Sequence, residues 1–205
     1  MLMEDLQTFL NILKPEILMI YGKAGTGKTT LASQLALQQA QQKKKVLFLD
    51  TEGGFSVDRL QQMAGEEWAT LLDQIVVMRV QNFTEQYDRV SGIVPLMAKF
   101  GLVVVDTIGH YYRQELKKDA TATNKLMDRQ LHVLFEISKK VPVLLTNQVY
   151  GDVINHRVAS IGGNMILKWC QTIIELQNDP RMLIMRKPEE KKQLFTIATR
   201  GVVFS

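Results

Sequence analysis

The residues with the clearest capacity for chemistry form a glycine-rich loop at positions 22–29, which reads Gly-Lys-Ala-Gly-Thr-Gly-Lys-Thr. Its glycines let the backbone curl so that N–H groups point at phosphate oxygens. Lys28 can then reach the β- and γ-phosphates while the Thr29 hydroxyl ligates Mg²⁺. A glycine-rich turn without a ligand is the alternative. The loop predicts a nucleotide site, most simply for ATP, formed by Gly22, Lys23, Ala24, Gly25, Thr26, Gly27, Lys28, Thr29 and Thr30.

A second candidate is Asp106, which ends the apolar run 102–105. A carboxylate at the end of a strand beside a phosphate loop can hold Mg²⁺ through its water shell. We therefore expect Thr29 and Asp106 to form the Mg²⁺ site, with the strand that ends in Asp106 next to the strand that precedes the loop. An aspartate that only caps a loop is the alternative.

Hydrolysis of a phosphoanhydride also needs a group that orients the attacking water. Asp50 and Glu52 follow the apolar run 46–49, and Gln148 follows the run 143–146. The ends of parallel strands meet at one rim of a sheet. We expect Glu52 to act as general base and Gln148 to sense a γ-phosphate, so Lys28, Glu52 and Gln148 are the predicted catalytic set. Gln148 as a simple strand-terminal hydrogen bonder is the alternative.

These residues need a sheet to bring them together, and the apolar pattern predicts one. Short apolar runs at 17–21, 46–49, 75–80, 102–105 and 143–146 alternate with helical patterns at 29–42, 57–72, 84–99 and 123–140. Gly92 and Pro95 should break or kink the third helix. This alternation predicts an α/β fold with a mainly parallel sheet. Runs at 172–176, 181–186 and 193–198 are expected to add antiparallel strands.

Composition fits one domain over residues 1–205, with an amphipathic helix at 1–14 packed on the core. We expect a cytoplasmic protein, because no apolar run reaches the length of a membrane span and the first residues lack a basic signal segment. The net charge is +4, and it is unevenly divided. Residues 1–110 hold ten Lys and Arg against twelve Asp and Glu, whereas residues 111–205 hold fifteen against nine. The basic second half indicates nucleic acid or a solvated basic face with about equal weight.

Taken together, the motifs resemble the ATPase cores of RecA/RadA-type recombinases over nearly the whole chain. The resemblance rests on the phosphate loop, residues 50–55 with Arg59, residues 102–107 with Tyr112-Arg113, residues 146–149 and residues 161–164, which occur in the order of that family. It is strongest to the short archaeal paralogues of the strand-exchange protein. It implies a RecA-like ATPase fold and a weak, DNA-dependent ATPase with ATP and Mg²⁺ as cofactors.

The resemblance also implies roles for residues that spacing alone does not single out. Arg59 falls on the arginine that stacks over adenine, a task suited to a planar guanidinium. Residues 112–124 and 150–160 correspond to the family's two DNA-binding loops. The implied DNA contacts are Arg113, Lys117, Lys118 and Arg157, and for each one an ordinary solvated charge is the alternative.

The implied partners are DNA, with single-stranded DNA first, and a recombinase or another repair protein. The resemblance also allows a homo-oligomer with the nucleotide near the interface between copies. Residues 1–16 supply no Phe-x-x-Ala polymerisation element, and both candidate DNA loops are short. We therefore expect an accessory protein of homologous recombination and DNA repair more than an autonomous recombinase. The alternatives are a nucleotide-dependent switch read by a protein partner and an ATPase of the same superfamily in signalling or motility.

Overall fold

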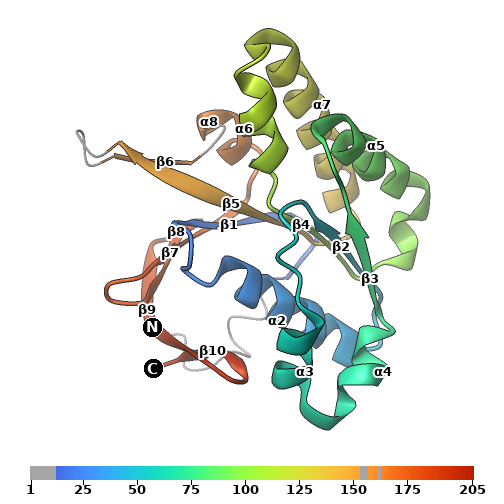
Figure 1. Cartoon of the computed structure of the whole chain (residues 1–205), viewed down its shortest axis with the longest axis vertical. Helices are drawn as coiled ribbons and strands as arrows, with labels where there is room; N and C mark the ends of the chain where they lie inside the picture. The colour runs from blue at the N-terminus through green and yellow to red at the C-terminus, as the bar shows by residue number, and fades with distance from the viewer. Residues whose placement is uncertain (1–12, 153–156, 161–162) are drawn as a thin grey trace.

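The computed structural model describes residues 13–152, 157–160 and 163–205, with side chains described outside residues 150–162. A mainly parallel sheet lies between two layers of helices (Figure 1). The strand order is β10-β9-β8-β7-β1-β5-β4-β2-β3, with β6 paired to β5. The parallel strands are β1 (Ile17–Gly22), β2 (Val46–Asp50), β3 (Ile75–Arg79), β4 (Leu102–Asp106), β5 (Val143–Asp152) and β7 (Thr172–Gln177). The antiparallel additions are β6 (Arg157–Ser160), β8 (Met182–Lys187), β9 (Lys191–Ala198) and β10 (Gly201–Phe204).

Helices cover both faces of the parallel strands. One layer holds α2 (Lys28–Gln41), α3 (Val57–Ala64), the 3-10 helix η1 (Gly65–Glu67) and α4 (Trp68–Leu72). The other holds α5 (Phe83–Ile93), the 3-10 helix η2 (Val94–Lys99), α6 (His110–Leu116), α7 (Ala120–Ser138) and α8 (Gly163–Leu167). Within the described residues, no helix is both long enough and apolar enough to cross a bilayer.

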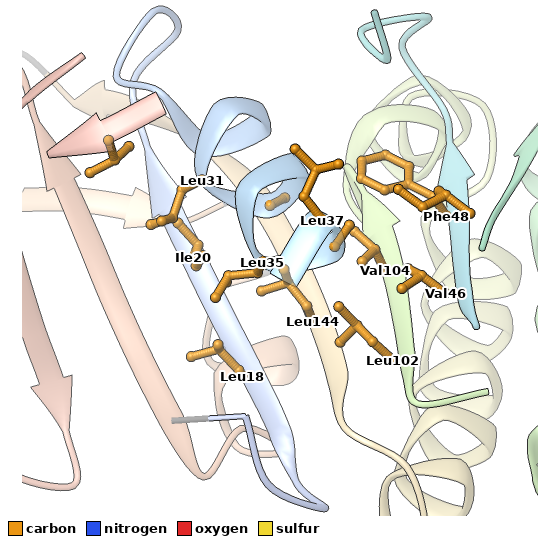
Figure 2. Close-up of a cluster of buried hydrophobic side chains, with 14 of the residues drawn as sticks. Leu18, Ile20, Leu31, Leu35, Leu37, Val46, Phe48, Leu102, Val104 and Leu144 are labelled. Carbon is orange, nitrogen blue, oxygen red and sulfur yellow. The ribbon is translucent and has the colours of Figure 1, made fainter. Parts of the chain in front are cut away.

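Successive residues of the central strands point to opposite faces, so each strand feeds two cores. Leu18 and Ile20 of β1 lie near Leu31 and Leu35 of α2, and Phe48 of β2 belongs to the same buried cluster, as Figure 2 shows. The residues between them in the strands pack under α5 to α8. Burial on both faces explains why these strands read as continuous apolar runs. The predicted α/β fold with its mainly parallel sheet and C-terminal antiparallel strands is confirmed.

Three features of the sheet and helices differ from the sequence-based expectation. The run 172–176 forms β7, which pairs with β8 in antiparallel fashion but with β1 in parallel fashion, so the antiparallel extension begins only at β8. Strand β4 is not the neighbour of β1, because β5 lies between them. The helical pattern 57–72 breaks at Gly65, whose φ of 64° lies outside the helical range.

The third predicted helix is divided as expected near Pro95, where α5 gives way to η2, although Gly92 lies inside α5 and does not break it. The two segments that the resemblance assigned to DNA loops contain regular structure. Residues 112–124 mostly belong to α6 and α7, joined by a short turn, and β5 continues to Asp152 before pairing with β6. The helix expected at 1–14 lies largely outside the described residues, and so does the side chain of Arg157.

Candidate functional site

The loop between β1 and α2 carries two glycines in conformations that suit glycine alone. Gly25 and Gly27 have φ values of 76° and 100°. Lys28 then begins α2, and its Nζ atom donates to the carbonyl oxygens of Gly22 and Lys23 at 3.0 and 2.8 Å. Burial lowers the pKa of Lys28, and the negative charges of Asp106 and Glu52 act in the opposite direction. The loop therefore holds a buried ammonium group at the mouth of a ring of backbone N–H groups, which suits a phosphate chain.

Thr29 of α2 and Asp106 of β4 meet behind the loop even though β4 is not the neighbour of β1. The Thr29 hydroxyl donates to Asp106 Oδ2 at 2.8 Å, and the hydroxyl of Thr146, from the intervening strand β5, donates to Asp106 Oδ1. Burial raises the pKa of Asp106, and the charges of Asp50 and Glu52 act in the same direction, whereas the two hydroxyl hydrogen bonds lower it. A hydroxyl oxygen beside a buried carboxylate is a set of hard oxygen donors of the kind that Mg²⁺ prefers.

Asp50 and Glu52 leave the same strand but have different surroundings. Asp50 is buried, and its carboxylate accepts the backbone N–H groups of Gly53, Gly54 and Phe55 at 2.8, 3.0 and 3.2 Å. It therefore holds the turn that carries Glu52. Sequence reasoning placed both carboxylates at the rim. The Gly-Gly pair that begins three residues after Asp50 was the signal that could have separated them, since Asp side chains commonly bond backbone groups of a following turn.

The carboxylate of Glu52 lies over the phosphate loop and accepts hydrogen bonds from two strands. Gln148 Nε2 donates to Oε2 and Oε1 at 3.0 and 3.1 Å, and Thr107 Oγ1 donates to Oε1 at 2.9 Å. Thr51 and Thr107 are joined by reciprocal hydrogen bonds of 2.9 and 2.8 Å, which fix the ends of β2 and β4 against each other. The predicted base and the predicted sensor are thus in direct contact.

One cavity brings most of the predicted site together. Its volume is about 320 Å³, and its lining includes Lys28, Thr29, Glu52 and Gln148 together with Ala24, Gly25 and Gly27 of the loop. Ile197 of β9 also lines it, and a Cβ atom at Gly27 would lie 2.8 Å from Ile197 Cδ1. Sequence reasoning missed Ile197, because an apolar residue in a distant antiparallel strand gives no sign of its neighbours.

Arg59 lies on α3, and its guanidinium is held by the β9–β10 turn, which directly follows the cavity-lining Ile197. It donates to the carbonyl oxygens of Ala198 and Thr199 at 2.6 and 3.1 Å and to Gln62 Oε1 at 3.0 Å. Its planar face is therefore fixed in orientation by main-chain acceptors, a condition that suits stacking on a flat ring.

Of the predicted DNA contacts, Arg113, Lys117 and Lys118 have described side chains, do not line the cavity and lie on or directly after α6. Lys117 is exposed, Lys118 Nζ pairs with Glu115 Oε1 at 2.8 Å, and Arg113 is half-buried. Tyr112 is buried and donates to Asn124 Oδ1 at 2.7 Å, so it fastens α6 to α7. The cavity lined by the glycine-rich loop is therefore distinct from the three basic residues on or after α6.

Comparison with known proteins adds to this geometry. The family model described as Rad51 matches residues 10–202. Relatives called "DNA repair and recombination protein RadB" include those of Methanoculleus marisnigri, 35% identical with 91% of this chain and 88% of the relative covered, and Methanocaldococcus jannaschii, 32% identical with 94% of each covered. The solved structure described as "Crystal structure of the RadB recombinase" is similar with a TM-score of 0.77 at 31% identity, covering 93% of this chain and 90% of that one.

Proposed function

The chain belongs to the Rad51 family, in the branch formed by the archaeal RadB proteins, and from this premise we propose that it is an ATP-binding, weakly hydrolysing accessory of homologous recombination and DNA repair. The observation that carries the ATPase part is the contact between Gln148 and Glu52 above the phosphate loop. This contact joins a group able to read a γ-phosphate to a group able to activate water.

In this proposal the phosphates of ATP lie on the loop 22–29, with Lys28 releasing its loop carbonyls to bind the β- and γ-phosphates. Thr29 and Asp106 would hold Mg²⁺, with Asp106 acting through water. When bound, the ion would neutralise negative charge on the β- and γ-phosphates. Arg59 would stack on the adenine. In these assignments the phosphates and the reacting groups occupy the cavity, and the adenine ring lies on the planar face of Arg59.

Hydrolysis would begin when Glu52 accepts a proton from a water molecule in line with the γ-phosphorus. The water oxygen forms a bond to phosphorus as the bond to the bridging oxygen breaks, which yields ADP and inorganic phosphate. Gln148 must leave Glu52 for this to occur, because its amide donates to both carboxylate oxygens. A carboxylate whose two oxygens both accept hydrogen bonds is less available as a base, which supports slow turnover.

Glu52→Gln separates hydrolysis from binding. We expect turnover to fall by about 10²–10⁴-fold, the usual contribution of a general base, while ATP binding remains. Lys28→Ala should lose binding as well, and Glu67→Gln, at an exposed position far from the cavity, should behave as wild type. Wild-type turnover in Glu52→Gln would remove Glu52 from the proposed role.

The fold also supports a role as a nucleotide-dependent switch. Gln148 belongs to β5, and the same strand continues to Asp152 and pairs with β6. A movement of Gln148 on binding ATP would therefore shift the β5–β6 hairpin, to which DNA or a protein partner could bind. If DNA or protein binding by Glu52→Gln survives and still depends on ATP, hydrolysis is not the function.

DNA binding is proposed for the basic surface formed by Arg113, Lys117 and Lys118, together with Arg157. Single-stranded DNA should bind most strongly at low salt with MgATP, because neutralised phosphates release counterions. Lys117→Ala should reduce the slope of log K against log salt by about one, whereas Lys139→Ala at the far end of α7 should not change it. No binding at low salt would contradict this part of the proposal.

A further inference from the structure

His110 is a polar group at the cavity for which the proposed mechanism has no use. It begins α6, three residues after Thr107, and its ring lies beside Glu52. The distance from His110 Nδ1 to Glu52 Oε1 is 3.4 Å. That nitrogen is buried and has no hydrogen-bond partner among the described residues. A buried ring nitrogen without a partner is unfavourable, and here its one polar neighbour is the predicted base.

The other side of the ring is fixed. His110 Nε2 lies 3.0 Å from Gln114 Nε2, one turn further along α6. The Gln114 amide nitrogen can only donate, so His110 Nε2 accepts and the proton of a neutral ring resides on Nδ1. Tyr111 packs edge-on against the ring, with 4.6 Å between centroids, and is itself tied to the Val80 carbonyl at 2.8 Å. The ring therefore carries its N–H group at Nδ1, the nitrogen that lies 3.4 Å from Glu52 Oε1.

In the structure this N–H group makes no hydrogen bond to Glu52, whose carboxylate already accepts from Gln148 and Thr107. When Gln148 turns to a γ-phosphate, Glu52 loses the donor shared by both oxygens. His110 Nδ1 is then the nearest remaining donor to Oε1 besides Thr107. It lies 3.4 Å from that oxygen, so a movement of a few tenths of an ångström would bring it to hydrogen-bond distance.

We propose that His110 is a positioning residue: its Nδ1–H donates to Glu52 Oε1 once Gln148 no longer does, so that Oε2 faces the attacking water. This inference rests on the proposed role of Glu52. Oε1 would then accept from Thr107 and His110, and Oε2 would be the basic oxygen. A fixed carboxylate raises the turnover number without changing affinity, because it acts on the attacking water and not on the bound nucleotide.

The test compares steady-state ATP hydrolysis by His110→Ala, His110→Asn and His110→Gln. An asparagine amide can place its nitrogen near the site of Nδ1, whereas glutamine places it near Nε2. We expect kcat to fall about tenfold or more in His110→Ala and His110→Gln with KM nearly unchanged, and to recover in His110→Asn, consistent with the sensitivity of catalysis to small misplacements. His132→Ala, which removes a ring packed on Trp169 and not at the cavity, is the matched control.

A double variant separates this inference from the role of Glu52. In the Glu52→Gln background, His110→Ala should cause no further loss, because residues that act as a unit are not additive. Wild-type kcat in His110→Ala beside an inactive Glu52→Gln would overturn the inference and leave the base in place. Active Glu52→Gln would overturn both. Equal losses in all three His110 variants would show a structural role and would also overturn it.

Discussion

At the scale of single residues, the most consequential contact at the metal end of the site is the one between Thr146 and Asp106. Thr146→Val keeps the shape of the side chain but removes a donor from a buried carboxylate. We expect the free energy of unfolding to fall by about 1–3 kcal/mol, the cost of leaving a buried polar atom unsatisfied. Urea denaturation measures this loss. Thr196→Val on the exposed face of β9 should change the stability by less than about 0.5 kcal/mol.

Loss of the hydrogen bond from Thr146 should also change the pKa of Asp106. Hydrogen bonds from Thr146 and Thr29 lower the pKa of Asp106 against the effect of burial, so removing one of them raises this pKa further. Thr146→Val should therefore lose Mg²⁺-dependent ATP binding at a higher pH than wild type when the pH is lowered. Identical stability and an identical pH limit in the two proteins would show that Thr146 does not support the carboxylate.

Sequence reasoning at this scale identified the loop residues, Glu52, Asp106 and Gln148 as neighbours of one rim, and they do lie together. The loop and these three residues each come at or shortly after the end of an apolar run, and parallel strands bring such ends to one edge. The division of labour between Asp50 and Glu52, and the approach of His110 to Glu52, depend on which way side chains point after the strand ends. Spacing along the chain contains no such information.

At the scale of elements, the close approach of β1 and β7 depends on Gly22. A Cβ atom there would lie 2.4 Å from the Leu176 carbonyl oxygen, which is backbone and cannot give way cheaply. Gly22→Ala should therefore destabilise the protein by about 1–3 kcal/mol, typical of overpacking, and should weaken ATP binding because the loop must shift. Urea denaturation and nucleotide titration would measure the two effects.

Gly92 provides the matched control for this change. It lies within α5, and no atom stands within 4 Å of the position of an added Cβ. Gly92→Ala should stabilise the protein by about 0.5–1 kcal/mol through helix propensity. Equal effects of the two alanine substitutions would refute the steric argument for Gly22.

The pairing of β7 with β8 and β1 is strengthened by a polar group, Glu175. Burial acts to raise its pKa, but hydrogen bonds from Gln177, Arg186 and Tyr21 and the charge of Arg186 outweigh burial, so the pKa is lowered. The Tyr21 hydroxyl donates at 3.1 Å, and the Arg186 guanidinium lies 2.8 Å from Glu175 Oε2. Burial in turn raises the pKa of Tyr21 to about 12.

A lowered carboxyl pKa fixes the sign of the pH dependence. The stabilisation by Glu175 is complete above its unfolded pKa of about 4.3 and is lost as the pH falls through the lower folded value. Glu175→Gln should therefore be less stable than wild type at pH 7, and the gap should close as the pH is lowered below about 4. Unfolding curves between pH 7 and pH 3 would check this, with the exposed Glu189→Gln as control. A gap independent of pH would contradict the ionic account.

The direction of β7 shows why elements were less predictable than residues. Its sequence alternates more than the other parallel strands, and alternation suggests an antiparallel strand with one solvated face. Yet five of the six residues of β7 are buried, and the strand pairs with β1 along one edge and with β8 along the other. Likewise, no local pattern indicates that β5 separates β1 from β4, because strand order is decided by packing of the whole sheet.

At the scale of the whole molecule, the apolar runs and their helical spacers were sufficient to predict the α/β architecture, since burial on both faces leaves a strong sequence signal. The resemblance to short archaeal recombinase paralogues is confirmed by the Rad51 family match and the RadB relatives. The continuation of β5 toward β6 was not predicted, because the family resemblance assigned a loop to residues that form strands.

Binding of MgATP should also raise the free energy of unfolding of the whole molecule, because a ligand that binds only the folded state shifts the unfolding equilibrium by mass action. MgATP at one hundred times its Kd should add about 2.7 kcal/mol, which corresponds to a rise in Tm of about 5–10 °C for a domain of this size. Lys28→Ala should lose most of this shift, since it removes the buried ammonium of the loop, and a chelator should reduce it in wild type. Lys139→Ala, remote from the loop, should keep the full shift. An unchanged shift in Lys28→Ala, measured by differential scanning calorimetry, would mean that ATP binds elsewhere than the loop.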